Sequence, residues 1–139
     1  MASIDRHVTR EVLALDETAP CREAAHLMEE RRIGAIAVRR EGRTVGLVTE
    51  RDLATRVVGR GVSPDTPIGD VMRRDLPSIA PAASEQECSD LMRESTTRHL
   101  LVEDCGKVIG IISMRDVIRL MLEDKQFLIE QLQTYIDGR

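Results

Sequence analysis

Short runs of apolar residues, separated by charged turns, mark the strands expected in this chain. The runs 35–38 and 45–48 flank a turn at Glu41-Gly42, and the runs 100–102 and 108–112 flank a turn at 104–107. Two apolar runs around a charged, glycine-containing turn are typical of a β-hairpin. The sequence therefore predicts two hairpins, and because their strands are continuously apolar, helices should cover them.

Helical spacing of apolar residues precedes and follows the first hairpin. Residues 21–30 place three apolar side chains on one face and predict a helix, entered after a short strand at 12–15. A second helix is predicted to begin at Glu50 and to end before Gly59, since glycine is a poor helix former and a good cap. The first half of the chain is therefore expected to have the order β-α-β-β-α.

The second half repeats the first at an offset of 64 residues, the distance from Asp52 to Asp116, and the match runs without a gap from Leu15 to Leu53. The predicted fold class is α/β (α+β), with two β-α-β-β-α repeats packed about a pseudo-twofold axis around a shared core. Each repeat begins with an apolar lead-in. The predicted divisions are 4–59 for repeat 1, 60–67 for a proline-containing linker, 68–123 for repeat 2 and 124–139 for a helical extension.

Composition excludes several classes of function. The net charge is -4 and the chain holds one Phe and one Tyr, so neither a basic surface nor aromatic platforms for nucleic acid are expected. The N-terminus has no apolar core like that of a signal peptide, and no apolar run approaches the ~18 residues of a membrane span. A cytoplasmic location without membrane contact is expected, and the three cysteines are predicted to be reduced thiols.

The sequence contains no catalytic constellation. His7, His26 and His99 lack the spacing of metal ligands, and no serine or cysteine has an identifiable base nearby. We therefore expect no catalytic residue, no metal site and no catalytic cofactor.

The repeated ends of the hairpins carry the candidate chemistry. Thr49 lies three residues before Asp52, and Ser113 three residues before Asp116, each pair at the junction of a strand and a helix. Such a pair can be a capping box alone. An ionised Asp can also accept both hydroxyls of a ribose, and a helix N-terminus preceded by arginine favours phosphate. Arg51 and Arg115 occupy the position before each Asp, which capping does not require.

Repeat length, element order and these paired motifs resemble tandem CBS (cystathionine beta-synthase) domains, and the resemblance covers nearly the whole chain. It extends to Ala24-Ala25-x-Leu27-Met28 and Arg98-His99-Leu100-x-Val102. It implies a stand-alone regulatory module of bacterial type with two clefts. The implied ligand is an adenosine-containing small molecule: AMP foremost, ADP, ATP, NAD(H) or S-adenosylmethionine. It implies also a homodimer and an unidentified regulated protein.

The resemblance implies that each cleft mixes the two repeats. Ser113 and Asp116 would hold ribose in one cleft, with contacts near Thr18, Ala19, Ala24 and Ile33. Thr49 and Asp52 would hold it in the other, with contacts from Ala83, Cys88 and Thr97. Arg98 and His99 occupy positions where repeat 1 has Gly34 and Ala35, so the clefts should differ. The Asp116 cleft is expected to favour phosphates, with Arg98, Arg115 and Arg51 as cations.

Apolar residues continue at helical spacing beyond Asp116 to Ile136, which predicts that the last helix extends past the repeat. This stripe is too short for a sustained coiled coil, so it should bury against a second subunit or against the chain's own module, and of these we favour a homodimer contact. Two other functions remain open. One is a structural dimerisation module with degenerate clefts, and the other is a small enzyme acting on a dinucleotide, for which the sequence supplies neither base nor metal.

Overall fold

The computed structural model describes residues 3–10 and 12–138. The chain divides into two compact units. The repeat-1 unit is Glu11–Leu76, and the repeat-2 unit combines Met1–Arg10 with Pro77–Arg139, as far as those residues are described. Each unit contains one three-stranded sheet and its own apolar core.

The repeat-1 unit has the predicted element order. Its strands are β1 (Ala14–Asp16), β2 (Ala35–Arg40) and β3 (Arg43–Thr49), in the order β1-β2-β3, with β1 parallel to β2 and β3 antiparallel to it. Helix α1 (Cys21–Arg31) connects the first two strands, and α2 (Glu50–Asp52) follows the third. The predicted second helix continues as a π-helical segment, η2 (Leu53–Val58), and it ends before Gly59 as expected.

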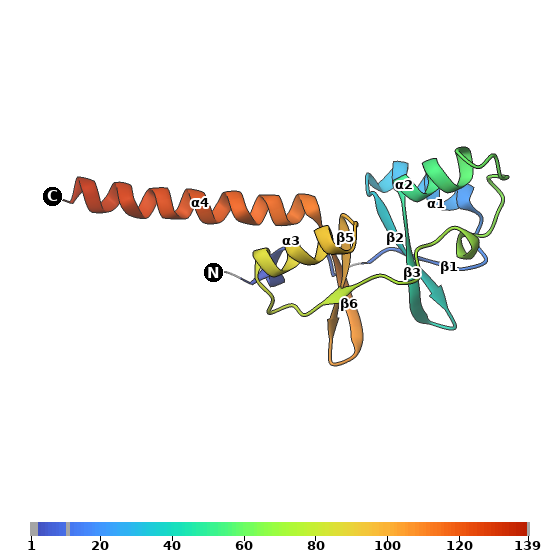
Figure 1. The fold of residues 1–139 in the computed structure, drawn as a ribbon, viewed down its shortest axis with the longest axis horizontal. Coiled ribbons are helices and arrows are strands. Elements are labelled where there is room, and N and C mark those ends of the chain that lie inside the picture. Colours follow the sequence, from blue (N-terminus) through green and yellow to red (C-terminus); the bar gives the residue numbers. More distant parts are fainter. Residues whose placement is uncertain (1–2, 11, 139) are drawn as a thin grey trace. The chain divides into compact units, whose positions relative to one another are not determined.

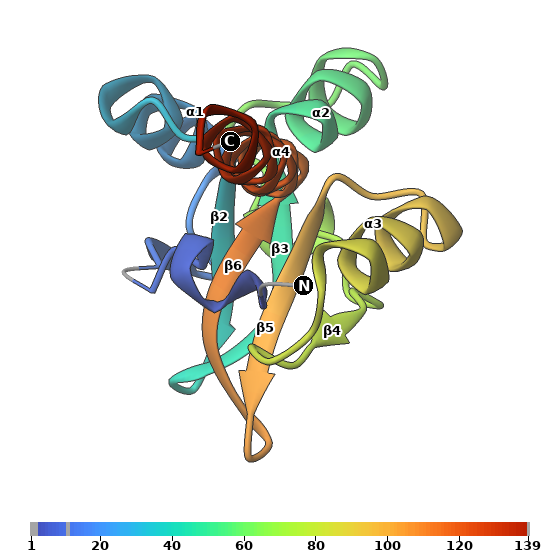
Figure 2. The ribbon, with the colours of Figure 1, turned by 90° about the vertical axis from the view of Figure 1, so that its left-hand side faces the viewer.

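The repeat-2 unit repeats this arrangement. Its sheet contains β4 (Ser78–Ile79), β5 (His99–Asp104) and β6 (Lys107–Ser113), which lie side by side in Figure 2. Helix α3 (Glu85–Glu94) follows β4, and α4 (Met114–Asp137) follows β6. The hairpins and helices predicted from apolar patterning are therefore present in both units, and α4 runs on without a break, as expected.

Backbone irregularities recur at the same offset as the sequence repeat. Arg32 and Thr96, which lie just after helices α1 and α3, have φ values of 53° and 51°, and the hairpin-turn residues Glu41 and Cys105 have 51° and 52°. Each hairpin also shifts register once, between Val38 and Arg39 and between Val102 and Glu103. The repeat is thus preserved in conformation as well as in residue type.

Each lead-in packs into the core of the unit formed mainly by the other repeat. The first contains η1 (Ile4–His7), and its Ile4 and Val8 are buried with Leu100 and Ile112 of repeat 2. The second contains η3 (Ile68–Asp70), and the apolar residues Ile68, Val71 and Met72 of this lead-in belong to the repeat-1 core. The boundaries of the repeats along the chain and the boundaries of the compact units therefore differ.

Gly46 and Gly110 leave room for the backbone of each lead-in to pair with the last strand of a sheet. Arg73 and Leu47 exchange two backbone hydrogen bonds of 2.9 and 3.0 Å, and Thr9 and Ile111 exchange two of 2.9 and 3.1 Å. Each lead-in thus adds backbone pairing to the outer edge of the last strand of a sheet. A Cβ atom at Gly46 would lie 2.6 Å from the Arg73 carbonyl oxygen, and one at Gly110 would lie 2.7 Å from the Thr9 oxygen.

The linker completes the N-terminus of α1. Pro20 is the N-cap of this helix and offers no side-chain bond to the first amides. The Cys21 N–H instead donates to the Thr66 carbonyl at 2.9 Å, and the Arg22 N–H donates to the Pro64 carbonyl at 2.8 Å. Because unpaired amides at a helix start need acceptors, the linker stabilises α1 as well as connecting the repeats.

A charged cluster joins η1 to α4. Glu123 accepts from Arg6 at 2.9 Å and from His7 Nε2 at 3.0 Å, and the hydrogen bond from His7 is the main reason that the pKa of Glu123 is lowered. Glu85, in the first turn of α3, lies against Asp124, and its Oε2 atom is buried with no hydrogen-bond partner among the described residues. Burial, followed by the hydrogen bond and charge of Asp124, raises the pKa of Glu85.

We predict that Gly46→Ala destabilises the protein by about 2 kcal/mol, in the range typical of overpacking. The added methyl group would meet backbone that cannot withdraw without breaking the Leu47–Arg73 pairing. Gly34→Ala is the matched control, because its Cβ would meet the end of the Glu50 side chain at 3.6 Å. Urea denaturation of both variants checks this, and equal loss of stability would contradict it.

We predict that Glu85→Gln raises the melting temperature at neutral pH. A carboxyl group whose pKa is raised in the folded state stabilises the fold below its unfolded pKa, near 4.5, and that contribution is lost as pH rises through the folded value. The gain should therefore shrink as pH falls towards 4. Glu87→Gln is the control, since it lies in the same helical turn but is exposed. Thermal melts between pH 4 and pH 7 measure the difference.

Candidate functional site

A reciprocal capping box closes each junction between the last strand and the following helix. The Thr49 N–H donates to Asp52 Oδ2 at 2.9 Å, and the Asp52 N–H donates back to Thr49 Oγ1 at 3.1 Å. In repeat 2 the corresponding distances are 2.9 Å from Ser113 N–H to Asp116 Oδ2 and 3.2 Å in return. The predicted capping is confirmed at both sites.

The loop before each hairpin is tied to the same junction. The Glu50 N–H donates to the Gly34 carbonyl at 3.0 Å, and the Met114 N–H donates to the Arg98 carbonyl at 2.8 Å. Within each unit, the residues just before the second strand therefore lie beside the helix start. This brings the predicted site residue Arg98 next to the Ser113–Asp116 pair, and Gly34 next to Thr49 and Asp52.

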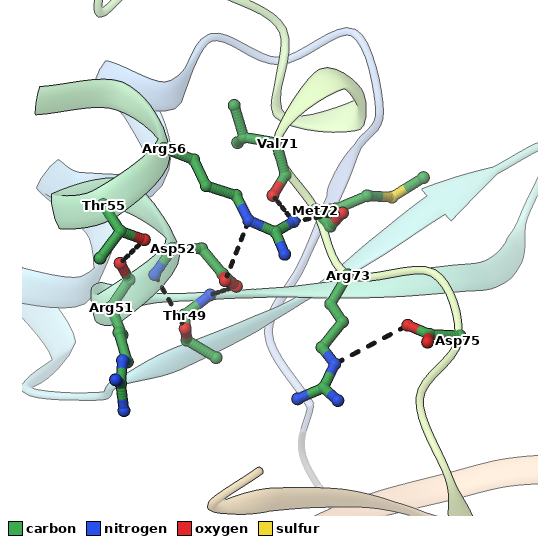
Figure 3. Close-up of polar contacts among 9 residues, drawn as sticks. All are labelled: Thr49, Arg51, Asp52, Thr55, Arg56, Val71, Met72, Arg73 and Asp75. Atoms are coloured by element: carbon green, nitrogen blue, oxygen red, sulfur yellow. Dashed lines mark hydrogen bonds and ion pairs between the residues drawn. The ribbon is translucent and has the colours of Figure 1, made fainter. Parts of the chain in front are cut away.

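Arg56 is a residue of the repeat-1 site that the sequence analysis missed. Its Nε atom lies 3.9 Å from Asp52 Oδ1, and its Nη1 atom donates to the Val71 and Met72 carbonyls at 2.9 and 3.2 Å. Figure 3 shows this side chain reaching from the helix towards the second lead-in, with Asp52 below it. The signal was available in the sequence, because Arg56 is four residues after Asp52 and such pairs share a helix face.

The two repeats differ at this position. The counterpart of Arg56 in repeat 2 is Leu120, which is completely buried in the core. Asp116 Oδ2 accepts two hydrogen bonds in the Ser113–Asp116 box, one from the Ser113 N–H and one of 2.8 Å from Ser113 Oγ. The third bond of the box runs from the Asp116 N–H to Ser113 Oγ, so none of the three uses Asp116 Oδ1. Asp52 therefore shares its second oxygen with a neighbouring arginine, whereas the corresponding Asp116 oxygen faces no arginine from this helix position.

The other predicted site residues occupy varied environments. Arg51, Arg98 and Arg115 are exposed, and Ala19 and Ile33 are half-buried. Ala24 is completely buried in the repeat-1 core, and Ala83 is 7% exposed. These two alanines therefore pack in the interior, and their contact with a ligand stays a prediction.

Two predicted polar residues organise local turns. Thr18 donates its hydroxyl to Asp16 Oδ2 at 2.7 Å and its N–H to the same oxygen at 3.1 Å, and these two bonds lower the pKa of Asp16. Thr97 donates its hydroxyl to the His99 carbonyl at 3.1 Å and accepts the His99 N–H at 3.3 Å. The turn that presents Arg98 is thus fixed on both sides.

The buried thiols belong to the cores. Cys88 is completely buried, and burial, with a smaller effect of the Asp116 charge, raises its pKa to about 11. Burial also raises the pKa of Cys21. Since a thiolate is the nucleophilic form, these environments oppose nucleophilic chemistry at either residue.

Over residues 3–10 and 12–138, no group of three or more His, Cys, Asp or Glu side chains is arranged to hold a metal ion. Among the helices in the same described residues, none combines the length and apolar character needed to cross a bilayer.

The fold and the paired junctions define a two-repeat module with a candidate ligand site in each repeat. A family model described as CBS domain matches residues 3–59 and 68–123. The chain therefore belongs to the CBS domain family, as the sequence resemblance predicted. CBS domain pairs are generally regulatory, ligand-binding modules, and the chain contains one such pair.

Comparison with individual proteins agrees with this assignment. CBS domain-containing protein YhcV of Bacillus subtilis is 32% identical over 117 residues, covering 84% of each chain. A putative signal-transduction protein with CBS domains from Burkholderia ambifaria has a TM-score of 0.79 and 35% identity, covering 83% of this chain and 85% of that one. An uncharacterized conserved protein from Pyrococcus horikoshii has a TM-score of 0.81 and 29% identity, covering 86% and 92%.

We predict that Thr49→Ala and Ser113→Ala each lower the free energy of unfolding by about 1 kcal/mol, the usual cost of a lost N-cap. Each change leaves the amide of the following Asp without its hydroxyl acceptor. Thr55→Ala is a control, because its hydroxyl donates to the Arg51 carbonyl within the same turn and does not cap a helix start. Denaturant titration measures all three, and a larger loss for Thr55→Ala would count against the role given to the caps.

Proposed function

We propose that this CBS pair is a sensor that binds an adenosine-containing nucleotide, with AMP as the first candidate, and that it regulates a partner protein. The family assignment supports a regulatory, ligand-binding role. The nucleotide itself is inferred from the chemistry of the strand–helix junctions. Each junction combines an acidic side chain, a hydroxyl group and the amides of a helix start.

The Ser113–Asp116 junction carries the proposal. Its capping box uses one carboxylate oxygen of Asp116, so the other remains able to accept a ribose hydroxyl. Arg115 is exposed in the first turn of α4, where an anion is favoured by both the helix dipole and the guanidinium group. Arg98 is held beside this turn by its carbonyl bond to the Met114 amide and adds a second cation. Ribose and phosphate therefore find complementary groups at one junction.

The Asp52 junction is proposed as the weaker site. Arg56 lies near Asp52 Oδ1 and is anchored by two carbonyl groups of the lead-in. A ribose hydroxyl at Asp52 would have to compete with this fixed cation. Gly34 also supplies no cation at the position that corresponds to Arg98. The difference between the two sites, expected from Arg98 and Gly34, is thus supported by a second pair, Arg56 and Leu120.

We predict that Asp116→Asn weakens AMP binding at least tenfold, roughly 1.5 kcal/mol, because ribose loses a charged acceptor. Asn keeps a carbonyl oxygen that can accept the Ser113 N–H, so the cap is largely preserved. Asp52→Asn is the matched change in the other repeat, and it should weaken AMP binding at the tighter site less than Asp116→Asn does. Isothermal titration calorimetry with AMP, ATP, S-adenosylmethionine and NADH tests both variants, alongside thermal melts that report folding.

Three outcomes would overturn parts of this proposal. If Asp116→Asn binds AMP as tightly as the unchanged protein, the ribose role of Asp116 is wrong. If Asp52→Asn loses more affinity than Asp116→Asn, the order of the sites is wrong. If none of the adenosyl compounds binds, the second candidate function applies, an interaction module whose junctions serve only as helix caps. The exposed apolar residues of α4 favour that second candidate as an independent observation.

A homodimer also belongs to the proposed function. Helix α4 exposes a series of large apolar side chains, with Leu122 at 61% and Ile136 at 62% exposure. Monomeric proteins rarely leave a contiguous apolar surface of this kind in water. A second copy of the chain would cover it.

A further inference from the structure

Helix α4 carries an apolar seam with coiled-coil spacing, which runs from Ile118 to Ile136. Figure 1 shows α4 extending well past α3, with which it shares the repeat-2 unit. The seam consists of positions separated alternately by four and three residues: Ile118, Leu122, Lys125, Ile129, Leu132 and Ile136. Its five apolar members are between 50% and 62% exposed. Alternation of four and three is the spacing by which one helix packs on another along a seam.

The two flanks of this seam differ in character. On one side lie Met121, Leu128 and Tyr135, spaced seven residues apart, and on the other lie Arg119, Gln126 and Gln133 at the same spacing. One flank is therefore apolar and the other polar along the whole seam. Leu128 is 59% exposed, so the apolar flank adds to the apolar surface that the seam exposes to water.

We propose that the partner of this seam is a second copy of the chain, paired antiparallel and centred at Phe127. In this register Ile118 lies against the partner's Ile136, Leu122 against the partner's Leu132, and Lys125 against the partner's Ile129. Every seam position then has a counterpart, with none left beyond the end of the contact. The paired region is about 28 Å long, at ~1.5 Å per residue over the seam.

The flanks and Lys125 select the antiparallel arrangement. In antiparallel helix pairs, each flank meets the same flank of the partner, so the apolar side meets the apolar side and the polar side meets the polar side. In a parallel pair each flank would meet the opposite one, and Gln126 would be set against apolar side chains. A parallel pair would also place Lys125 against the partner's Lys125 within the seam, where like charges repel. In the antiparallel pair, the aliphatic stem of Lys125 can pack on the partner's Ile129 while the ammonium group of Lys125 reaches water.

This inference deepens the proposed homodimer and is independent of nucleotide binding. Its test uses cysteine pairs and a short bis-maleimide crosslinker, in a Cys105→Ser background because Cys105 is the exposed native thiol. The variants are Leu122→Cys, Leu132→Cys and the double variant with both changes. Two such residues on one helix are ~15 Å apart, so a short reagent can join them only between copies.

We expect the double variant to crosslink efficiently into a dimer, and each single variant to crosslink several-fold less. The reverse result, efficient crosslinking of each single variant, would mean a parallel pair and overturn the proposal. Crosslinking of none of the three would exclude α4 as the interface. Leu128→Cys is a positive control for the antiparallel register, because position 128 lies next to the twofold axis and close to its own copy.

The solution mass provides a second readout. Leu132→Glu places a charge in the seam and should convert the dimer to a monomer, whereas Gln131→Glu, one residue away and off the seam, should leave the mass unchanged. A dimer that persists in Leu132→Glu would overturn the proposal. Calorimetry with AMP on the same variant separates the α4 dimer from the proposed nucleotide binding. Nucleotide binding can fail while the dimer persists, and the dimer can be lost while nucleotide binding persists.

Discussion

Backbone pairing between each lead-in and the outer edge of a β-hairpin is the constraint on which the rest of this structure depends. The Thr9–Ile111 and Leu47–Arg73 pairs cover strand edges that would otherwise expose unpaired amides and carbonyls. They require glycine at Gly46 and Gly110, because a side chain there would occupy the space of the lead-in backbone. They also bring Val71 and Met72 to Arg56, so that the same pairing shapes the Asp52 junction.

The strand–helix junctions combine a structural role, as helix caps, with the ligand-binding role that we propose for the same residues. Asp52 and Asp116 each use one oxygen to hold the preceding backbone amide and thereby fix the start of a helix. The carboxylate is consequently held in one orientation beside the helix N-terminus, which would lower the entropy cost of binding the proposed ligand. In the proposed function, the neighbour of the second carboxylate oxygen distinguishes the two junctions. That neighbour is Arg56 in one repeat, while Leu120 supplies no charge in the other.

Much of the fold could be predicted because its signals are local. Strand and helix patterns, the capping boxes and the continuation of α4 depend on residues close together in sequence. All of these except the continuation of α4 occur twice, at the 64-residue offset. The Arg56 contact was missed although Arg56 lies four residues after Asp52, since its significance depends on lead-in carbonyls that are distant in sequence. Ala24 and Ala83 illustrate the same limit, because a small apolar residue looks alike in sequence whether it lines a site or fills a core.

The sequence by itself determined the repeated β-α-β-β-α order, the two Thr/Ser–Asp junctions and the apolar stripe of the last helix. Only the tertiary structure decided which core each lead-in joins, since Ile4 and Ile68 are apolar in the same way and would suit either core by composition. It also showed that Gly46 and Gly110 leave room for the lead-in backbone as well as preceding the Thr/Ser–Asp junctions. The physical reason is that burial rewards any apolar side chain, whereas the choice between two similar cores depends on the path of the chain and on backbone pairing.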